Sequence, residues 1–306
     1  MKKATIQPYV FESISDLHRV LELPKPEHPL VSVVNMENIK CHFDDRFKSV
    51  VYNFYSICIK KNFKGTMRYG QSYYDFDEGT MTFFSPGQVI SAIVEEDIAL
   101  NGYWLILHPD FIRNYPLGKN IKNFGYFSYA TNEALHLSEK EEAMITGIMK
   151  DIEHEYCSII DSFSQDVIVS QSELLLNYCN RFYNRQFITR KNASNDLLLK
   201  MEEILGDYFN GEKVAQFGLP SVHYLAEQLN ISPNYLSDML RNLTGQNAQQ
   251  HIHNKLIEKA KEILTTTNNS VSEIAYQLGF EYPQSFSKLF KSKTNISPLA
   301  FRSSFN

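Results

Sequence analysis

Short apolar runs fill the first part of the chain, and Gly, Pro and Asn interrupt them at short intervals. The clearest runs cover residues 49–60, 73–86 and 102–111. Each is β-branched, aromatic or alternating in character, which is typical of strands. Several short strands at this spacing indicate a small antiparallel barrel or jelly roll. The pattern therefore predicts a strand-rich domain over residues 1–137.

The hydrophobic period changes to 3.6 residues at Leu137. Ser138 and Glu141 form a capping-box pattern at the start of one amphipathic stretch, and a second stretch covers residues 166–187. We therefore expect a helical hairpin over residues 138–190. The next part has a linker-like start and only one helical stretch, so residues 191–220 are predicted to be a linker that contains a helix over residues 196–210 and then a loop.

Residues 221–306 read as helical throughout, and they contain the same pattern twice. Leu225 and Ala226 align with Ile274 and Ala275, and Pro233 aligns with Pro283 after one extra residue in the second corner. Each copy is a short helix, a tight corner and a second helix, the form of a helix-turn-helix. The apolar residues of each second helix share one side, which must face a core. They are Leu236, Leu240 and Leu243 in the first copy and Phe286, Leu289 and Phe290 in the second.

The opposite side of each second helix is polar, and its residues recur at the same positions in both copies. Asn and Gln pair bidentately with adenine, Lys contacts guanine, Asp accepts from cytosine, and Arg or Lys reaches phosphate. A merely solvated face is the alternative, and the repetition favours DNA binding over it. The expected DNA-binding residues are Asn234, Ser237, Asp238, Arg241, Gln284, Ser285, Ser287, Lys288 and Lys291.

The two copies are joined by residues 247–264, whose apolar positions have helical spacing. Such a helix spans roughly 27 Å at about 1.5 Å per residue. That length suits two recognition helices about one DNA turn, roughly 34 Å, apart. We therefore expect one chain to enter two successive major grooves.

Charge adds a weak signal. The whole chain has a net charge of -5, but residues 221–306 hold 8 Lys and Arg against 6 Asp and Glu. A mildly basic module behind an acidic front part fits a DNA-binding region. No stretch has the length of a membrane span or the apolar run of a signal peptide, so we expect a cytoplasmic protein without membrane contact. The four cysteines stand far apart and are expected to be reduced, buried hydrophobes.

The doublet closely resembles the DNA-binding region of AraC-type (AraC/XylS) bacterial transcriptional regulators. The most specific part of the resemblance lies at Glu273–Phe280, Ser285–Lys291 and Pro298–Arg302. Asn295 stands where the family usually has Gly, and we expect it to adopt the left-handed conformation needed there. Asp238 stands where a basic residue is more usual, which weakens the expected base readout by the first copy.

The resemblance also implies a fold class and a set of partners. The fold is α+β, with a cupin-like antiparallel β-barrel as the effector domain at residues 1–137, dimerisation-type helices at residues 138–190 and the double helix-turn-helix domain at residues 221–306. The implied function is sequence-specific regulation of transcription in response to a small molecule. The implied partners are double-stranded DNA, a small-molecule effector, a second copy of the chain and RNA polymerase. No cofactor is expected.

An enzyme on a cupin fold would need a metal held by closely spaced His and Glu residues. Residues 65–88, where that pattern belongs, contain no histidine, and His42, His108 and His136 are isolated. His251 and His253 lie two residues apart in a predicted helix and point in different directions. We therefore expect neither a metal nor enzymatic activity. The alternative function is a cupin-fold binding protein for a sugar or similar small molecule, enzymatic or not, whose helical C-terminal region is a partner surface.

Two features of the N-terminal part have two interpretations each. Aromatic residues could line a ligand pocket or form ordinary core packing. They are Tyr69, Tyr73, Tyr74, Phe83 and Trp104. A second apolar cluster could be a dimer interface or could pack on its own domain, and we favour the dimer. Its members are Leu174, Leu175, Leu176, Tyr178 and Cys179.

Overall fold

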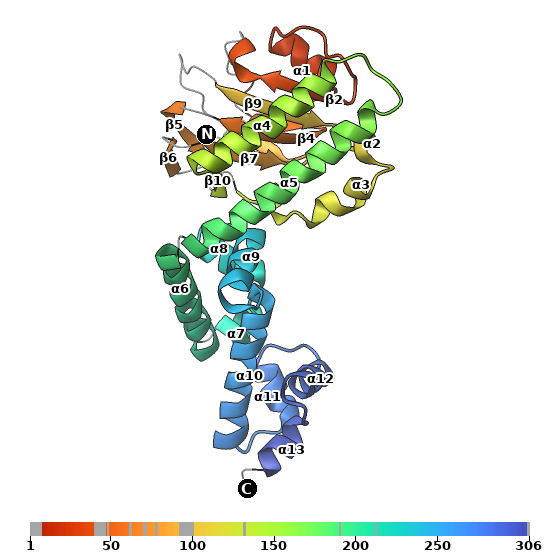
Figure 1. Cartoon of the computed structure of the whole chain (residues 1–306). Coiled ribbons are helices and arrows are strands. Elements are labelled where there is room, and N and C mark those ends of the chain that lie inside the picture. The colour runs from red at the N-terminus through yellow and green to blue at the C-terminus, as the bar shows by residue number, and fades with distance from the viewer. Residues whose placement is uncertain are drawn as a thin grey trace, which may run out of the picture. The chain divides into compact units, whose positions relative to one another are not determined.

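The structure is a computed structural model of the 306-residue chain. It describes residues 8–39, 47, 49–60, 63–69, 72–76, 79–91, 101–130, 133–189, 191–211 and 213–304. The chain divides into two compact units, Met1–Gln186 and Phe187–Asn306. Figure 1 shows that the first unit combines strands with helices and that the second is helical.

Two main sheets and a separate hairpin form the N-terminal unit. The five-stranded sheet is antiparallel and has the order β10-β7-β4-β9-β2. Its strands are β2 (Val31–Asn35), β4 (Tyr55–Lys60), β7 (Thr80–Phe84), β9 (Gly102–Leu107) and β10 (Leu135–His136). The three-stranded sheet has the order β1-β3-β8, from β1 (Tyr9–Phe11), β3 (Ser49–Tyr52) and β8 (Val89–Ser91). The hairpin pairs β5 (Phe63–Tyr69) with β6 (Ser72–Phe76).

The expected cupin-like antiparallel barrel is not confirmed. Among the residues that the structure describes, no strand pairing joins the sheets into a closed barrel, and β1 pairs with β3 in parallel. The apolar run over residues 49–60 is not one strand, because the chain bends at Asn53 and Phe54 and enters the other sheet. The bend is held by Asn53 N–H, which donates to the Phe11 carbonyl at 3.3 Å. The sequence pattern indicated strands in this part of the chain, but it did not separate β3 from β4 or indicate the sheet to which each belongs.

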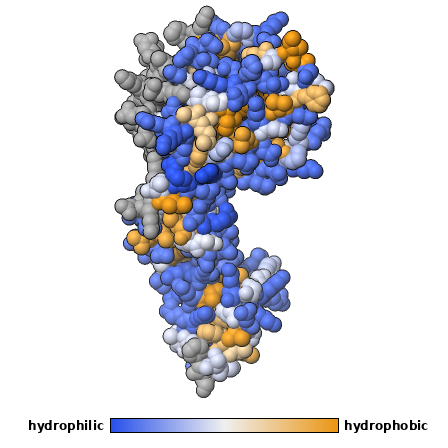
Figure 2. Space-filling model, viewed as in Figure 1, coloured by the Kyte–Doolittle hydropathy of each residue, from blue (hydrophilic) through white to orange (hydrophobic). Residues whose placement is uncertain are grey.

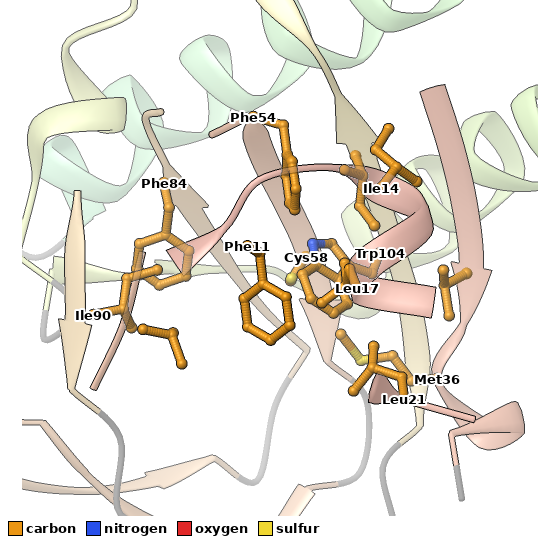
Figure 3. Close-up of a cluster of buried hydrophobic side chains, with 13 residues drawn as sticks. Phe11, Ile14, Leu17, Leu21, Met36, Phe54, Cys58, Phe84, Ile90 and Trp104 are labelled. Carbon is orange, nitrogen blue, oxygen red and sulfur yellow. The ribbon is translucent and has the colours of Figure 1, made fainter. Parts of the chain in front are cut away.

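The main core of this unit lies between the two sheets. Side chains from one face of the five-stranded sheet meet the three-stranded sheet and α1 (Ile14–Val20), as Figure 3 shows. Phe11, Phe54 and Trp104 are buried there, and the Trp104 indole N–H donates to Ser56 Oγ at 2.7 Å. Each large apolar side chain buried in this way contributes roughly 1.5 to 3 kcal/mol. The indole is satisfied as well as buried, so Trp104 has a structural role here.

Two long helices cover the other face of the five-stranded sheet (Figure 1). They are α4 (Glu139–Tyr156) and α5 (Ser164–Thr189), and α4 begins with the capping box between Ser138 and Glu141 that the sequence predicted. Short helices precede them, namely η1 (Met36–Asn38), α2 (Pro109–Ile112), α3 (Pro116–Asn120), η3 (Ile121–Asn123) and η4 (Gly125–Ser128). The two helices bury their apolar stripes, which include Ile145, Met149, Ile152, Leu175, Leu176 and Cys179.

This packing corrects our preference for a dimer interface at the cluster around Leu174. Leu175, Leu176 and Cys179 are fully buried on their own domain, and the Cys179 thiol contacts Met81 Sδ on β7 at 3.6 Å. Leu174 is 48% exposed, and Tyr178 is half-buried. Neighbouring residues of a helix point in different directions, so the five residues of this cluster cannot all share one interface.

The cysteines also follow the sequence prediction in part. Cys58 and Cys179 are free and buried, whereas Cys157 is free and exposed; Cys41 lies outside the described residues. Burial raises the pKa of the Cys58 thiol to about 11. The two buried thiols are therefore neutral at physiological pH and pack as small hydrophobes.

The C-terminal unit contains the helices α6 (Lys191–Asn210), α7 (Lys213–Phe217), α8 (Val222–Gln228), α9 (Pro233–Thr244), α10 (Ala248–Thr266), α11 (Val271–Gln277), α12 (Pro283–Thr294) and α13 (Pro298–Ser303). Two of them differ from the expectation for residues 191–220. Helix α6 begins within the linker-like stretch, and α7 occupies the expected loop. Both are held by packing, since Met201, Leu205 and Val214 are buried. Composition indicated a linker because it does not report such tertiary contacts.

No helix in the described part of the chain is long and apolar enough to cross a membrane.

Candidate nucleic-acid interface

The first helix pair is α8 with α9, joined by a corner at residues 229–232. Ser221 and Ser232 cap the two helices, each with its hydroxyl accepting from the backbone N–H three residues on, at 3.1 and 3.2 Å. Pro233 occupies the first turn of α9, where its missing N–H costs nothing. These local signals explain why the sequence forms two short helices here and not one long helix.

The second helix pair is α11 with α12, joined by a corner at residues 278–282 that is one residue longer. Ser270 and Glu273 form a capping box at the start of α11, and hydrogen bonds from the backbone and hydroxyl of Ser270 lower the pKa of Glu273. Pro283 opens α12 as Pro233 opens α9. The N-cap of α12 differs, because Tyr282 makes no side-chain cap hydrogen bond.

The two corners use the same backbone geometry. Asn230 and Gly279 are both left-handed, with φ of 55° and 81°. The next residue, Ile231 or Phe280, donates its N–H to Ala226 O or Ala275 O at 3.0 and 2.9 Å. Asn and Gly are the residues that tolerate this conformation. The sequence repeat is therefore also a structural repeat.

The ends of α9 and α12 repeat as well. Gly245 and Asn295 are left-handed, with φ of 75° and 63°, and each donates its N–H to the carbonyl four residues earlier, at 2.9 and 2.8 Å. The left-handed conformation expected of Asn295 is confirmed. Thr244 and Thr294 both turn their hydroxyls back to the carbonyl four residues earlier, at 2.8 Å. Asn therefore replaces Gly at this helix end without a change in the local hydrogen bonds.

The buried sides of the two second helices largely match the prediction. Leu236 and Leu240 in α9, and Phe286 and Phe290 in α12, are fully buried. Leu243 and Leu289 are only half-buried. Met239, which the sequence analysis did not assign to the core, is fully buried. The buried stripe of α9 therefore includes Met239, about one turn before Leu243.

The expected DNA-binding residues all lie on the outward side of these helices. Asn234, Arg241, Gln284, Ser285, Lys288 and Lys291 are exposed, while Ser237, Asp238 and Ser287 are half-buried. The structure thus places four of them together on α9 and five together on α12. Whether they bind DNA remains a prediction.

The outward faces of α9 and α12 differ in charge. On α9, Arg241 Nη1 lies 2.7 Å from Asp238 Oδ1, so the cation of this face is engaged by an acid one turn earlier. Helix α12 contains no acidic residue, and its lysines are Lys288, Lys291 and Lys293. All three are exposed, and Lys288 and Lys291 lie on the outward face. The second face is therefore the more strongly cationic, and it suits a polyanionic partner better.

Two residues that the sequence analysis passed over belong beside this surface. Lys293 lowers the pKa of His253 on α10, after burial, so its charge lies near that helix. Tyr282 is 60% exposed at the first turn of α12. The spacing of Lys293, two residues after Lys291, places it off the outward face of α12, so the pattern of that face could not identify it. No pattern in the sequence distinguishes Tyr282 from a core aromatic residue.

Helix α10 connects the pairs and supports both. The seven apolar residues that the sequence predicted for its core face are all buried, namely Ala248, Ile252, Leu256, Ile257, Ala260, Ile263 and Leu264. Its 19 residues correspond to roughly 28 Å at about 1.5 Å each. His251 and His253 have different partners, the Thr244 hydroxyl and the Gln249 amide, both at 2.9 Å. Burial lowers the pKa of both, so both are neutral at pH 7.

The aromatic residues that could either line a ligand pocket or pack in the core fall into three groups. Trp104 belongs to the core described above. Phe83 packs against Tyr126, with ring centroids 4.5 Å apart, beside a cavity of about 10 Å³ that is too small for an organic ligand. The side chains of Tyr69, Tyr73 and Tyr74 lie outside the described residues. For the two that can be placed, core packing is the interpretation that the structure supports.

Comparison with known proteins also identifies the part of the chain that contains the two helix pairs. A family model described as "Helix-turn-helix domain" matches residues 225–304. The raffinose operon transcriptional regulatory protein RafR of Pediococcus pentosaceus is 35% identical over 80 residues, 26% of this chain and 29% of RafR. The transcriptional activator RhaS of Escherichia coli O139:H28 is 29% identical over 139 residues, 45% of either chain. The matched regions thus span less than half of these relatives.

Among solved structures, the C-terminal domain of the response regulator yesN from Fusobacterium nucleatum is 32% identical, with a TM-score of 0.31. The match covers 35% of this chain and 98% of that domain. Residues 225–304 form a helix-turn-helix domain. That domain is of the AraC type, so the resemblance found in the sequence is confirmed for this part of the chain.

Proposed function

We propose that the protein is a transcriptional regulator that binds double-stranded DNA through two helix-turn-helix units. The first unit is α8–α9 and the second is α11–α12. The observation that carries the proposal is the structural repeat, in which both pairs share the corner, the helix end and a polar outward face. A repeat of this kind on one connecting helix suits two successive major grooves.

Within each unit, the residues divide by their chemistry. Gln284 has an amide that can pair with adenine, and Lys288 can donate to guanine. Asn234 and Ser237 would contact bases from the first unit. Arg241 and Lys291 lie one turn further along their helices and would contact phosphate. Base contacts would determine specificity, and phosphate contacts would determine affinity and its dependence on salt.

The proposal extends to a homodimer formed through the outer face of α5. Leu175, Leu176 and Cys179 are buried on the chain's own sheet, so the free apolar residues are on the opposite side. Val167 and Leu174 are 37% and 48% exposed, and seven residues separate them, which places both on one side of the helix. Figure 2 shows hydrophobic patches among hydrophilic side chains on the molecular face that carries α4 and α5. Exposed apolar side chains along a long helix suit a second copy of that helix.

The experiment that tests the function is selection of genomic DNA fragments by the purified full-length protein. We expect one motif with two half-sites centred about one turn apart, roughly 34 Å. Affinity for the best fragment is then measured against salt, and log affinity should fall linearly with log salt. Gln284→Ala should relax the motif, whereas Lys140→Ala, at an exposed position of α4, should not change it. Failure to enrich any fragment at low salt would contradict the proposal.

A further inference from the structure

A pocket of about 200 Å³ lies in the N-terminal unit, outside the core between the two sheets. Its floor is β2, at Val33, Val34 and Asn35. One wall is His18 of α1 with the loop at residues 23–27, and the other is the C-terminal end of α4. Strand β2 is an edge strand of its sheet, and α4 packs on it (Figure 1). The pocket is thus bounded by three elements of one compact unit.

Hydrogen bonds hold the walls of the pocket in place. The Pro24 carbonyl can only accept, so the His18 Nδ1–H donates to it, at 2.6 Å. Burial lowers the pKa of His18, so the ring is neutral and its Nε2 accepts from Ser32 Oγ, at 2.8 Å. On the other side, Glu27 N–H donates to the Tyr156 hydroxyl at 2.7 Å. The loop is therefore tied to both α1 and α4, and the pocket is preformed.

Two carboxylates line this pocket, one from each wall. Glu27 comes from the loop and Glu153 from α4, and both raise the pKa of the Cys157 thiol, after burial, so both act on the same point of the lining. Burial raises the pKa of Glu153 itself, with an opposing effect from Lys150. Within the described part of the chain, the Glu153 carboxylate has neither a hydrogen bond nor an ion pair. A half-buried carboxylate without a hydrogen bond is costly, and a cation would offset that cost.

The rest of the lining combines apolar residues with polar and charged ones, namely His18, Lys25, Asn35, Asn38 and Tyr156. Leu23 and Pro24 lie on the loop side, and Val33 and Val34 are almost completely buried in the floor. Lys25 stands at the exposed rim. An ammonium group has three donors for carboxylate oxygens, and an apolar body would cover Leu23 and Val33. A hydrated inorganic ion would gain nothing from that apolar floor.

We propose that this pocket binds a small organic cation, a primary amine on a short apolar body. The ammonium group lies between Glu153 and Glu27, and the body lies against Leu23 and Val33. Such a site differs in place and in chemistry from an aromatic pocket between the sheets. The inference does not depend on DNA binding, so it is tested without DNA.

The test uses the full-length protein and a matched pair of probes, 2-phenylethylamine and its neutral isostere 2-phenylethanol. Isothermal titration calorimetry and ligand-observed NMR measure binding of each. We expect the amine to bind and the alcohol to bind much more weakly. Glu153→Gln should weaken binding of the amine by roughly tenfold or more, since hydrogen bonds to charged groups are stronger than those between neutral groups. Glu155→Gln, on the same helix but outside the pocket, should leave it unchanged.

A second variant guards against an effect on folding. Cys157 is exposed at the end of α4, so Cys157→Phe should fold and should obstruct the pocket. We expect loss of amine binding with an unchanged circular dichroism spectrum. Absence of amine binding at millimolar concentration, equal binding of amine and alcohol, or full binding by folded Glu153→Gln would each overturn the proposal.

Discussion

The two helix pairs of the C-terminal unit share their backbone but not their surfaces. Both corners are left-handed at the same position, and both second helices end with the same threonine contact. Yet α9 pairs its Arg241 with Asp238, whereas α12 has three lysines and no acid. The repeat therefore keeps the residues that form the corners and the helix ends, whereas the outward residues differ between the two pairs. The two pairs should therefore respond differently to equivalent substitutions.

The largest contrast is expected at the corners. A Cβ on Gly279 would lie 2.9 Å from Gly218 Cα, and Gly279 also has a positive φ. Gly279→Ala should therefore cost about 3 kcal/mol of unfolding free energy, from roughly 1 to 2 for the conformation and roughly 1 to 3 for the overlap. Asn230→Ala, at the equivalent position, should cost about 1 kcal/mol from the conformation alone. Urea unfolding measures both, and equal losses would show that the corners are equally tolerant.

The next contrast concerns base readout. Lys288 and Asp238 occupy equivalent positions, and only the lysine is expected to donate to a base. Lys288→Ala should cost about 1 to 3 kcal/mol on the best DNA fragment and relax specificity there, and Gln284→Ala should do the same. Asp238→Ala should not weaken binding. Fluorescence anisotropy on the best fragment and on single-base variants gives both numbers. A loss of affinity that is equal on every DNA sequence would show that Lys288 and Gln284 do not contact bases.

A smaller contrast should appear in the salt dependence. Lys291→Ala should weaken binding evenly across sequences and reduce the salt slope by about 1. Arg241→Ala should have less effect, because Asp238 already engages the guanidinium. Asp238→Asn should release Arg241 and tighten binding by roughly 0.2 to 1 kcal/mol, the range of an exposed ion pair. Binding isotherms at several salt concentrations distinguish these cases, and weaker binding by Asp238→Asn would assign the acid a direct role in recognition.

The smallest contrast lies at the start of the second helices. Ser232 caps α9 through its hydroxyl, whereas Tyr282 leaves α12 without a side-chain cap. Tyr282→Ser should therefore raise stability by about 0.5 to 1 kcal/mol, and Ser232→Ala should lower it by about 1 kcal/mol. Thermal unfolding of the two variants provides the measurement. A destabilising Tyr282→Ser would show that the exposed ring makes contacts that outweigh a cap.

Local and periodic features of this fold could be predicted from the sequence. The core face of α10, the capping box at Ser138 and the left-handed Asn295 each depend on residues within one or two turns. The polar faces of α9 and α12 could also be predicted, because the repeat shows them twice. The Asp238–Arg241 pair was missed, although its spacing of three residues indicates it.

Features that depend on distant contacts could not be predicted. Nothing near Asn53 indicates that the chain changes sheets there, because its bond partner, Phe11, lies far away in the sequence. The parallel pairing of β1 with β3 has no local signal either. Helix α7 is held by Val214 in a stretch whose composition is that of a loop. The carboxylates of the N-terminal pocket come from segments more than a hundred residues apart.

The close approach of Gly218 to Gly279 joins the segment before the two helix pairs to the corner of the second pair. Gly218 precedes both helix pairs in the chain, yet it supports the corner of the second pair and accepts a hydrogen bond from the Tyr208 hydroxyl at 3.0 Å. A fragment cut at Ser221 would keep every residue of the repeat and lose this brace. The compact unit accordingly begins at Phe187, well before the first residue of the family match, and it includes α6 and α7.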